Sequence, residues 1–188
     1  MNKIGLLFFG AGLVVPLMTV WLWLQYGIPD AISGSILGIS SLFIGFATLA
    51  SPIIAKKIGL IKAIVATQAA STLFMFATPL SSSYLVASSV YTVRAFLMNM
   101  SSPLSQSMIM GVVDEDVRGL ASGVNAALWR LPNALSTLIG AYLMGTGQLA
   151  LPFYIAGLLY AVSIGLFWYY FKKTKMPEEF AANQPLNP

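Results

Sequence analysis

Long apolar segments follow one another along the chain, and short stretches rich in polar residues, glycine and proline separate them. Each apolar segment is near the roughly 20 residues that an α-helix needs to cross a bilayer. The connections carry turn-forming residues. We therefore predict an all-α integral membrane protein with six transmembrane helices, at about residues 4–26, 31–54, 60–79, 84–112, 117–145 and 150–171. These form one bundle over residues 1–171, and the polar, proline-containing residues 172–188 are predicted to be a disordered cytoplasmic tail.

Polar side chains gather on one face of the fifth segment. At about 100° per residue they lie within roughly 140°, and leucines occupy the opposite side. This polar face consists of Ser122, Asn125, Trp129, Arg130, Asn133, Ser136, Thr137 and Gly140. An arginine in the middle of a membrane helix costs about 2.5–3.5 kcal/mol on insertion scales, so this face is expected to meet water, polar groups or a substrate. Our candidates for lining a transport path or binding its substrate are Asn125, Trp129, Arg130 and Asn133.

The fourth segment also carries a polar sector that cannot face lipid. Arg94, Asn99 and Gln106 belong to it and are further cavity-lining candidates, with Pro103 among them. For each arginine, a structural link between helices is an equally good interpretation. Asparagine and glutamine in membrane helices are more often interhelical hydrogen-bonding groups than ligands. Arg94 lies nearer the outer end, where it can also snorkel to the interface or act in gating.

The residue types that the sequence lacks argue against several classes of function. Of its 188 residues, 57% are hydrophobic and 9% are charged, whereas a soluble domain has about 25% charged residues. The sequence has no cysteine and no histidine, and its acidic residues all lie outside the predicted segments. We therefore expect no enzyme, no metal site and no cofactor. The net charge of +4 is spread over segment ends and indicates no nucleic-acid partner.

Positive charges fall on one side of the six-segment arrangement. Because Lys and Arg concentrate in cytoplasmic loops, both termini are predicted to be cytoplasmic, in a multi-pass protein of the plasma membrane. The aromatic residues Trp21, Trp23 and Tyr26 then fall at the outer end of the first segment, where we interpret them as interfacial anchors. The positive charges at segment ends are Lys3, Lys56, Lys57, Lys62, Arg118, Lys172, Lys173 and Lys175, whereas Arg94 and Arg130 lie inside segments.

Further patterns concern helix packing. Pro16 removes one helical hydrogen bond from the first segment and predicts a kink. The sixth segment has no interior charge and is predicted to be peripheral and lipid-facing. The second segment has a face of small residues that lets another helix approach closely. That face consists of Gly34, Gly38, Ser41, Gly45 and Thr48.

The two halves of the six-segment region show a faint internal repeat. Ser33-Gly34 recurs as Ser122-Gly123, and Pro16-Leu17 recurs as Pro103-Leu104. So few matches can also arise by chance. If the repeat is real, two units of three segments lie in opposite orientations, because three is odd. The sequence thus predicts a 3+3 inverted repeat.

The connection after the second segment resembles a known motif. Residues 52–62, PIIAKKIGLIK, are similar to a degenerate copy of the basic loop motif of the major facilitator superfamily, G-x-L-a-D-r-x-G-r-r. Ala55, Lys57 and Gly59 stand at matching positions, but a lysine replaces the motif's Asp, so no gating salt bridge is expected there. The RG-x-ASG and WRLPN stretches of the fifth segment also look like the eleventh helix of that family. Residues 1–171 therefore resemble the C-terminal six-helix half of such a transporter.

The resemblance implies a permease in which the first, second, fourth and fifth segments line a central cavity. A small solute, anionic or drug-like, would cross by alternating access between this bundle and a second one. The partner would be an N-terminal six-helix half or a second copy of the chain. The alternative is a non-transporting membrane subunit or a truncated permease, whose polar helix face is an assembly surface. With no titratable carboxylate or histidine inside a segment, the chain offers no proton carrier of its own.

Overall fold

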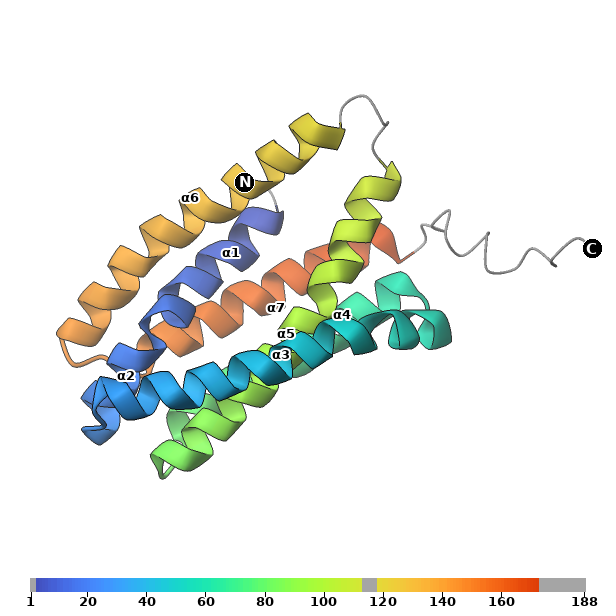
Figure 1. Ribbon diagram of the computed structural model, residues 1–188. Coiled ribbons are helices and arrows are strands. Elements are labelled where there is room, and N and C mark those ends of the chain that lie inside the picture. Colours follow the sequence, from blue (N-terminus) through green and yellow to red (C-terminus); the bar gives the residue numbers. More distant parts are fainter. Residues whose placement is uncertain (1–2, 113–117, 173–188) are drawn as a thin grey trace, which may run out of the picture.

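The computed structural model describes residues 3–112 and 118–172, and these residues are helical except for short connections (Figure 1). Each predicted segment is occupied by helix. The predicted tail, from residue 173 onward, lies outside the described residues. The elements are α1 (Lys3–Val14), the 3₁₀ turn η1 (Val15–Leu17), α2 (Met18–Tyr26), α3 (Asp30–Ile58), α4 (Leu60–Ala77), η2 (Thr78–Leu80), α5 (Tyr84–Val112), α6 (Arg118–Gly145) and α7 (Leu151–Phe171).

Two prolines have different effects on their helices. Pro16 lies in the 3₁₀ turn that separates α1 from α2, which agrees with the predicted kink. Pro52, in contrast, lies inside α3, which continues to Ile58. A proline leaves the carbonyl four residues earlier without its helical donor, and at Pro52 the Ser51 hydroxyl donates to that carbonyl, on Thr48, at 3.0 Å. The second helix ends at Ile58, four residues beyond its predicted end at residue 54.

Gly59 alone separates α3 from α4. Its φ of 86° and ψ of 151° lie in a region that is essentially restricted to glycine. Its amide N–H donates to the Ala55 carbonyl at 2.9 Å, which completes the last turn of α3. The chain therefore reverses direction within one residue, and the conformation of Gly59 explains why a glycine stands there.

Four helical segments are long and apolar enough to cross a bilayer among the described residues: Leu6–Tyr26, Asp30–Ile58, Leu60–Leu80 and Leu151–Phe171. The fold is therefore that of an all-helical membrane protein. The helices α5 and α6 are not in this group, although they contain 29 and 28 residues. They are the two helices that carry the arginines, and a span count of six stays a prediction.

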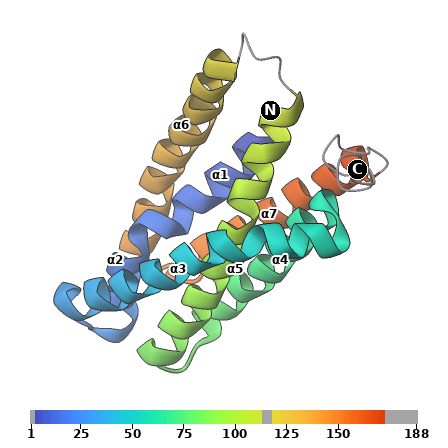
Figure 2. The ribbon, with the colours of Figure 1, turned by 45° about the vertical axis from the view of Figure 1, so that its right-hand side comes forward.

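Six of the helices pack as two groups of three, and α2 packs against α3 (Figure 2). In one group, α1 lies between α6 and α7; in the other, α5 lies between α3 and α4. The pair α4–α7 joins the groups. Consequently α1 packs mainly against helices from the far end of the sequence rather than against α3 or α4.

The buried core corrects one prediction from the sequence. Trp21 is fully buried, packs on Phe153 with ring centroids 4.8 Å apart, and donates its indole N–H to the Leu149 carbonyl at 3.0 Å, so it is not an interfacial anchor. The helix α7 has one buried side and one exposed side, so its predicted peripheral position is not contradicted. The buried residues of α7 are Pro152, Phe153, Ala156, Gly157, Tyr160, Ser163 and Ile164.

Candidate functional site

The polar face of α6 packs partly against α1. A Cβ atom added to Gly12 would overlap the Ser136 hydroxyl and the Asn133 carbonyl oxygen, and one added to Gly140 would overlap the Leu13 carbonyl oxygen. The two backbones are therefore in direct contact, as small residues permit in membrane helices. Within the predicted polar face, Ser136 and Gly140 thus lie in a helix–helix contact rather than facing a cavity.

Polar side chains of α6 also donate to carbonyls of α1. Because Pro16 has no N–H, the Gly12 carbonyl lacks its helical donor, and the Thr137 hydroxyl lies 3.0 Å from that carbonyl oxygen and 2.8 Å from the Asn133 carbonyl oxygen. The Asn133 side-chain amide donates to the Phe8 carbonyl at 3.5 Å. In this structure the candidate Asn133 therefore links helices.

Arg94 is buried between helices, with 3% of its surface exposed. Its Nη2 donates to the Tyr160 hydroxyl of α7 at 2.7 Å. Its Cζ atom lies 5.5 Å from the Tyr160 ring centroid and 5.8 Å from that of Tyr91, within the range of cation–π attraction. Its Nε has no hydrogen-bond partner among the described residues. The guanidinium thus connects α5 to α7 and is stabilised by tyrosines rather than by a carboxylate.

Tyr160 was not among the candidates from the sequence, although it is central to this cluster. It is fully buried, and its ring is also so close to α1 that a Cβ on Gly10 would approach within 2.9 Å. A buried tyrosine hydroxyl usually has a hydrogen-bond partner. A tyrosine near the middle of a mostly apolar helix was the signal available in the sequence.

Other polar contacts hold α5 against its neighbours. Gln68 of α4 donates to the Ser101 hydroxyl at 3.1 Å. The Ser71 hydroxyl, also on α4, donates to the Arg94 carbonyl at 3.0 Å. The hydroxyls of Ser40 and Thr92 lie 2.6 Å apart and join α3 to α5. These polar groups lie at helix contacts, where they satisfy one another.

The remaining candidates do not form a single cluster. Arg130 is exposed on α6, on the side of the helix not covered by α1. Asn99 is half-buried and its amide donates to the Ala95 carbonyl of its own helix at 2.8 Å. Gln106, Asn125 and Trp129 belong to α5 and α6, but their side chains lie outside the described residues.

The residues of the loop motif lie at the junction of α3 and α4. Ala55 is half-buried and supplies the carbonyl that Gly59 caps, and Lys57 is exposed on the last turn of α3. A small apolar cluster packs at the same end of the molecule, where Ile54 and Phe171 contact the buried residues of α4. The motif thus lies where α3 ends, α4 begins and α7 ends.

A family model identifies the family of this chain. No curated protein is significantly similar to the sequence. The family described as Major Facilitator Superfamily matches residues 4–187, which is almost the whole chain. Its members are multi-pass membrane proteins that transport small molecules. With its apolar helices and buried polar contacts, the chain belongs to the Major Facilitator Superfamily.

Proposed function

We propose that this chain is the C-terminal half of a permease and moves a small anionic or drug-like solute by alternating access with a second six-helix bundle. Arg130 carries the proposal, because it is an exposed cation on a helix that packs along one side only. No acidic residue of the described chain forms an ion pair with it. An arginine at this depth facing lipid is costly, and a water-filled path or an anionic solute removes that cost.

The packing pattern supports the 3+3 repeat. In the predicted repeat, α1 with α2 corresponds to α5, α3 corresponds to α6, and α4 corresponds to α7. Under this exchange the helix pair α1–α6 becomes α5–α3, and the pair α1–α7 becomes α5–α4. The pair α4–α7 is converted into itself. The main helix pairs are therefore reproduced by the exchange, as expected for two related three-helix units in opposite orientations.

The surface of α3 supports a second bundle. Its face of small residues is exposed, and Cβ atoms added to Gly34, Gly38 or Gly45 would have no atom within 4 Å. Small residues on a membrane helix permit close approach of another helix. The described part of this chain supplies no such helix, so we assign this face to the partner bundle.

The surface of α6 offers a second face of the same kind. Four small residues share the side of Arg130, within roughly 60° of one another and of the arginine. All of them are exposed. With the face on α3, they form two borders between which a path for solute can lie. These residues are Gly123, Ala127, Ala134 and Ala141.

Arg94 has a different role in this proposal. Its burial and its bond to Tyr160 favour a link that holds α5 and α7 together. In this proposal Arg130 therefore lines the transport path, and Arg94 lies between α5 and α7 without contacting the solute. Asn99, Gln106, Asn125 and Trp129 stay cavity-lining proposals, since their helices would border the same path.

The positive charges support an orientation with both termini in the cytoplasm of a plasma-membrane protein. Lys56 and Lys57 end α3, Lys62 lies in the first turn of α4, and Lys172 follows α7. The cluster of apolar residues around Leu60 brings these helix ends together. Such an accumulation of lysines at one end is typical of a cytoplasmic face.

Transport by reconstituted protein tests the proposal. The chain is placed in liposomes alone and together with a six-span N-terminal half, and uptake of carboxyfluorescein and of ethidium is followed. We expect flux that Arg130→Gln lowers at least tenfold and that Lys57→Gln leaves unchanged. If neither preparation transports either dye, or if Arg130→Gln reduces only the amount of assembled complex and not the flux per complex, the path assignment is wrong and an assembly surface is the better explanation.

A further inference from the structure

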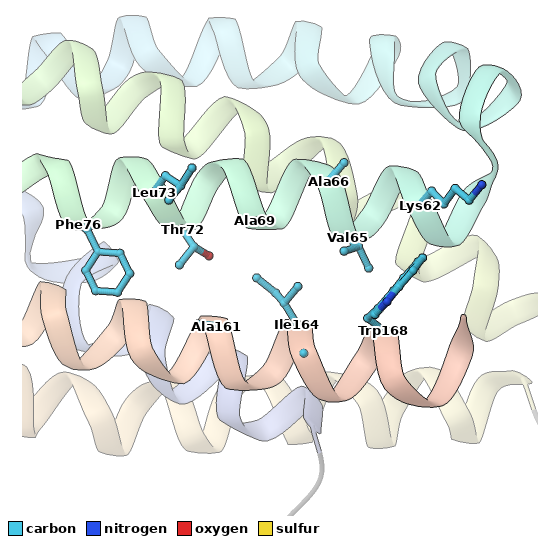
Figure 3. Close-up of a pocket in the computed structure, with 11 residues that line it drawn as sticks. Lys62, Val65, Ala66, Ala69, Thr72, Leu73, Phe76, Ala161, Ile164 and Trp168 are labelled. Carbon is cyan, nitrogen blue, oxygen red and sulfur yellow. The ribbon is translucent and has the colours of Figure 1, made fainter. Parts of the chain in front are cut away.

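An open groove of about 570 Å³ lies between α4 and α7, on the outside of the bundle (Figure 3). This volume falls within the roughly 300–1,000 Å³ of typical ligand pockets. Its residues belong to the third and sixth predicted spans, which the proposed transport path does not use. The groove therefore needs a separate explanation.

Residue size produces the groove. Four of its lining residues are small, Ala66 and Ala69 on α4 and Ala161 and Gly165 on α7, while the Ile164 side chain lies between the helices (Figure 3). A Cβ added to Gly165 would have no atom within 4 Å, so the space beside it is open. The two helices are thus separated by a trough where bulkier side chains would otherwise fill the contact.

The two ends of the groove differ. At one end Phe76 stacks on Tyr154, with ring centroids 6.3 Å apart, and its ring lies 2.5 Å from a Cβ added to Gly157, which closes the trough. At the other end lie Lys62 and Trp168 (Figure 3). From Lys62 to Phe76 the groove follows α4 for about 21 Å at 1.5 Å per residue. That length exceeds the roughly 15 Å depth of one leaflet's hydrocarbon layer.

The chemistry of the walls matches a lipid. The one hydroxyl on the groove wall, on Thr72, already donates to the Gln68 carbonyl at 2.8 Å, so the wall presents no open polar group along its length. Lys62 is exposed, and no carboxylate of the described residues forms a salt bridge with it. The Trp168 indole beside it adds a donor of the kind found at membrane interfaces. An apolar trough with a cation at its open end complements an acyl chain with an anionic headgroup.

We propose that this groove binds one anionic phospholipid, with an acyl chain along α4 and α7 and its phosphate at Lys62. A lysine near the headgroup region attracts anionic lipid, and basic sites between membrane helices bind such headgroups. The preference over a zwitterionic lipid of the same chains is expected to be about fivefold, from one lysine.

Quenching of Trp168 fluorescence tests the proposal with the whole chain in lipid nanodiscs. Brominated phosphatidylglycerol and brominated phosphatidylcholine are titrated separately, and the quenching lost in Trp168→Phe gives the contribution of Trp168. We expect half-maximal quenching at about a fivefold lower mole fraction of the anionic lipid. Lys62→Gln should abolish this difference, and its matched control Lys57→Gln should preserve it.

A second pair of variants tests the trough. Gly165→Phe fills open space and should reduce quenching by both lipids at least threefold, whereas Leu166→Phe, on a residue outside the groove, should not. Ala69→Phe, on the opposite wall, repeats the test. Equal quenching by the two lipids in the unmodified chain overturns the anionic site. A preference that disappears in Lys62→Gln but survives both phenylalanine variants overturns the placement of the acyl chain.

Discussion

Thr137→Val is expected to weaken the contact between α1 and α6 through a single carbonyl oxygen. The Thr137 hydroxyl lies 3.0 Å from the Gly12 carbonyl oxygen, which Pro16 leaves without a helical donor, and shares its proton with the Asn133 carbonyl at 2.8 Å. Valine has nearly the shape of threonine but no hydroxyl, so packing is conserved and the carbonyl becomes unsatisfied. Hydrogen bonds between membrane helices contribute about 0.6 kcal/mol on average and up to about 1.7 kcal/mol. An orphaned buried acceptor costs roughly 1–3 kcal/mol. We expect a loss of about 1–2 kcal/mol in the free energy of unfolding.

Repeating Thr137→Val in a chain that carries Pro16→Ala distinguishes the loss of this hydrogen bond from a general loss of packing. Alanine restores an N–H at position 16, which can donate to the Gly12 carbonyl as in a regular helix. Thr137→Val should then cost only about 0.5 kcal/mol, since the carbonyl has another donor. The expected coupling between the two substitutions is about 1 kcal/mol, which exceeds the roughly 0.3–0.5 kcal/mol error of additivity for independent sites.

Steric trapping in bicelles measures these free energies, and the absence of cysteine from the sequence lets two biotin sites be introduced without background. Thr48→Val is the control, because the exposed Thr48 hydroxyl bonds only the Gly45 carbonyl of its own helix, and its cost should stay within about 0.5 kcal/mol. If Thr137→Val costs the same in both backgrounds, the Gly12 carbonyl does not depend on Thr137 and the explanation is wrong.

Other substitutions test separate features. Gly59→Ala should lower the unfolding free energy by about 1–3 kcal/mol, since alanine is strained at a φ of 86°; no change in thermal unfolding would contradict the one-residue turn. Tyr160→Phe should cost about 1.5–3 kcal/mol by removing the acceptor of Arg94, and a cost below 0.5 kcal/mol by the same trapping assay would show that the guanidinium finds another partner. Gly140→Ala should prevent close approach of α1 and raise susceptibility to proteolysis, whereas Gly38→Ala, on an open surface, should be neutral or stabilising by up to about 1 kcal/mol; equal effects would refute the contact.

The helix positions could be predicted from the sequence because a bilayer fixes the length of apolar segments. Pro16 likewise gave a correct prediction, since the missing N–H acts locally. The predicted second segment already contained Pro52, but α3 continues past the predicted end at residue 54 to Ile58, because the conformation of Gly59 alone makes the turn. Local chemistry of this kind is difficult to recognise from a single sequence.

The partners of polar residues could not be predicted. Periodicity placed Thr137 and Asn133 on a polar face, but periodicity does not say whether the face meets water or another helix. In the structure they donate to carbonyls of α1. For Arg94 the partner is Tyr160, in a helix whose sequence is otherwise apolar. Pairing across such distances depends on the arrangement of whole helices, which residue patterns alone do not determine.

The position of α1 between α6 and α7 has a consequence for biosynthesis. Gly12 and Thr137 are separated by 125 residues. At a synthesis rate of about 5–20 residues per second, the first helix waits roughly 6–25 s for its partner to be made. During that time its open carbonyl and its close-packing glycines face lipid or the insertion machinery. The helix α1 is thus synthesised many seconds before its partner α6 exists. A membrane chaperone that shields α1 would have that time in which to act.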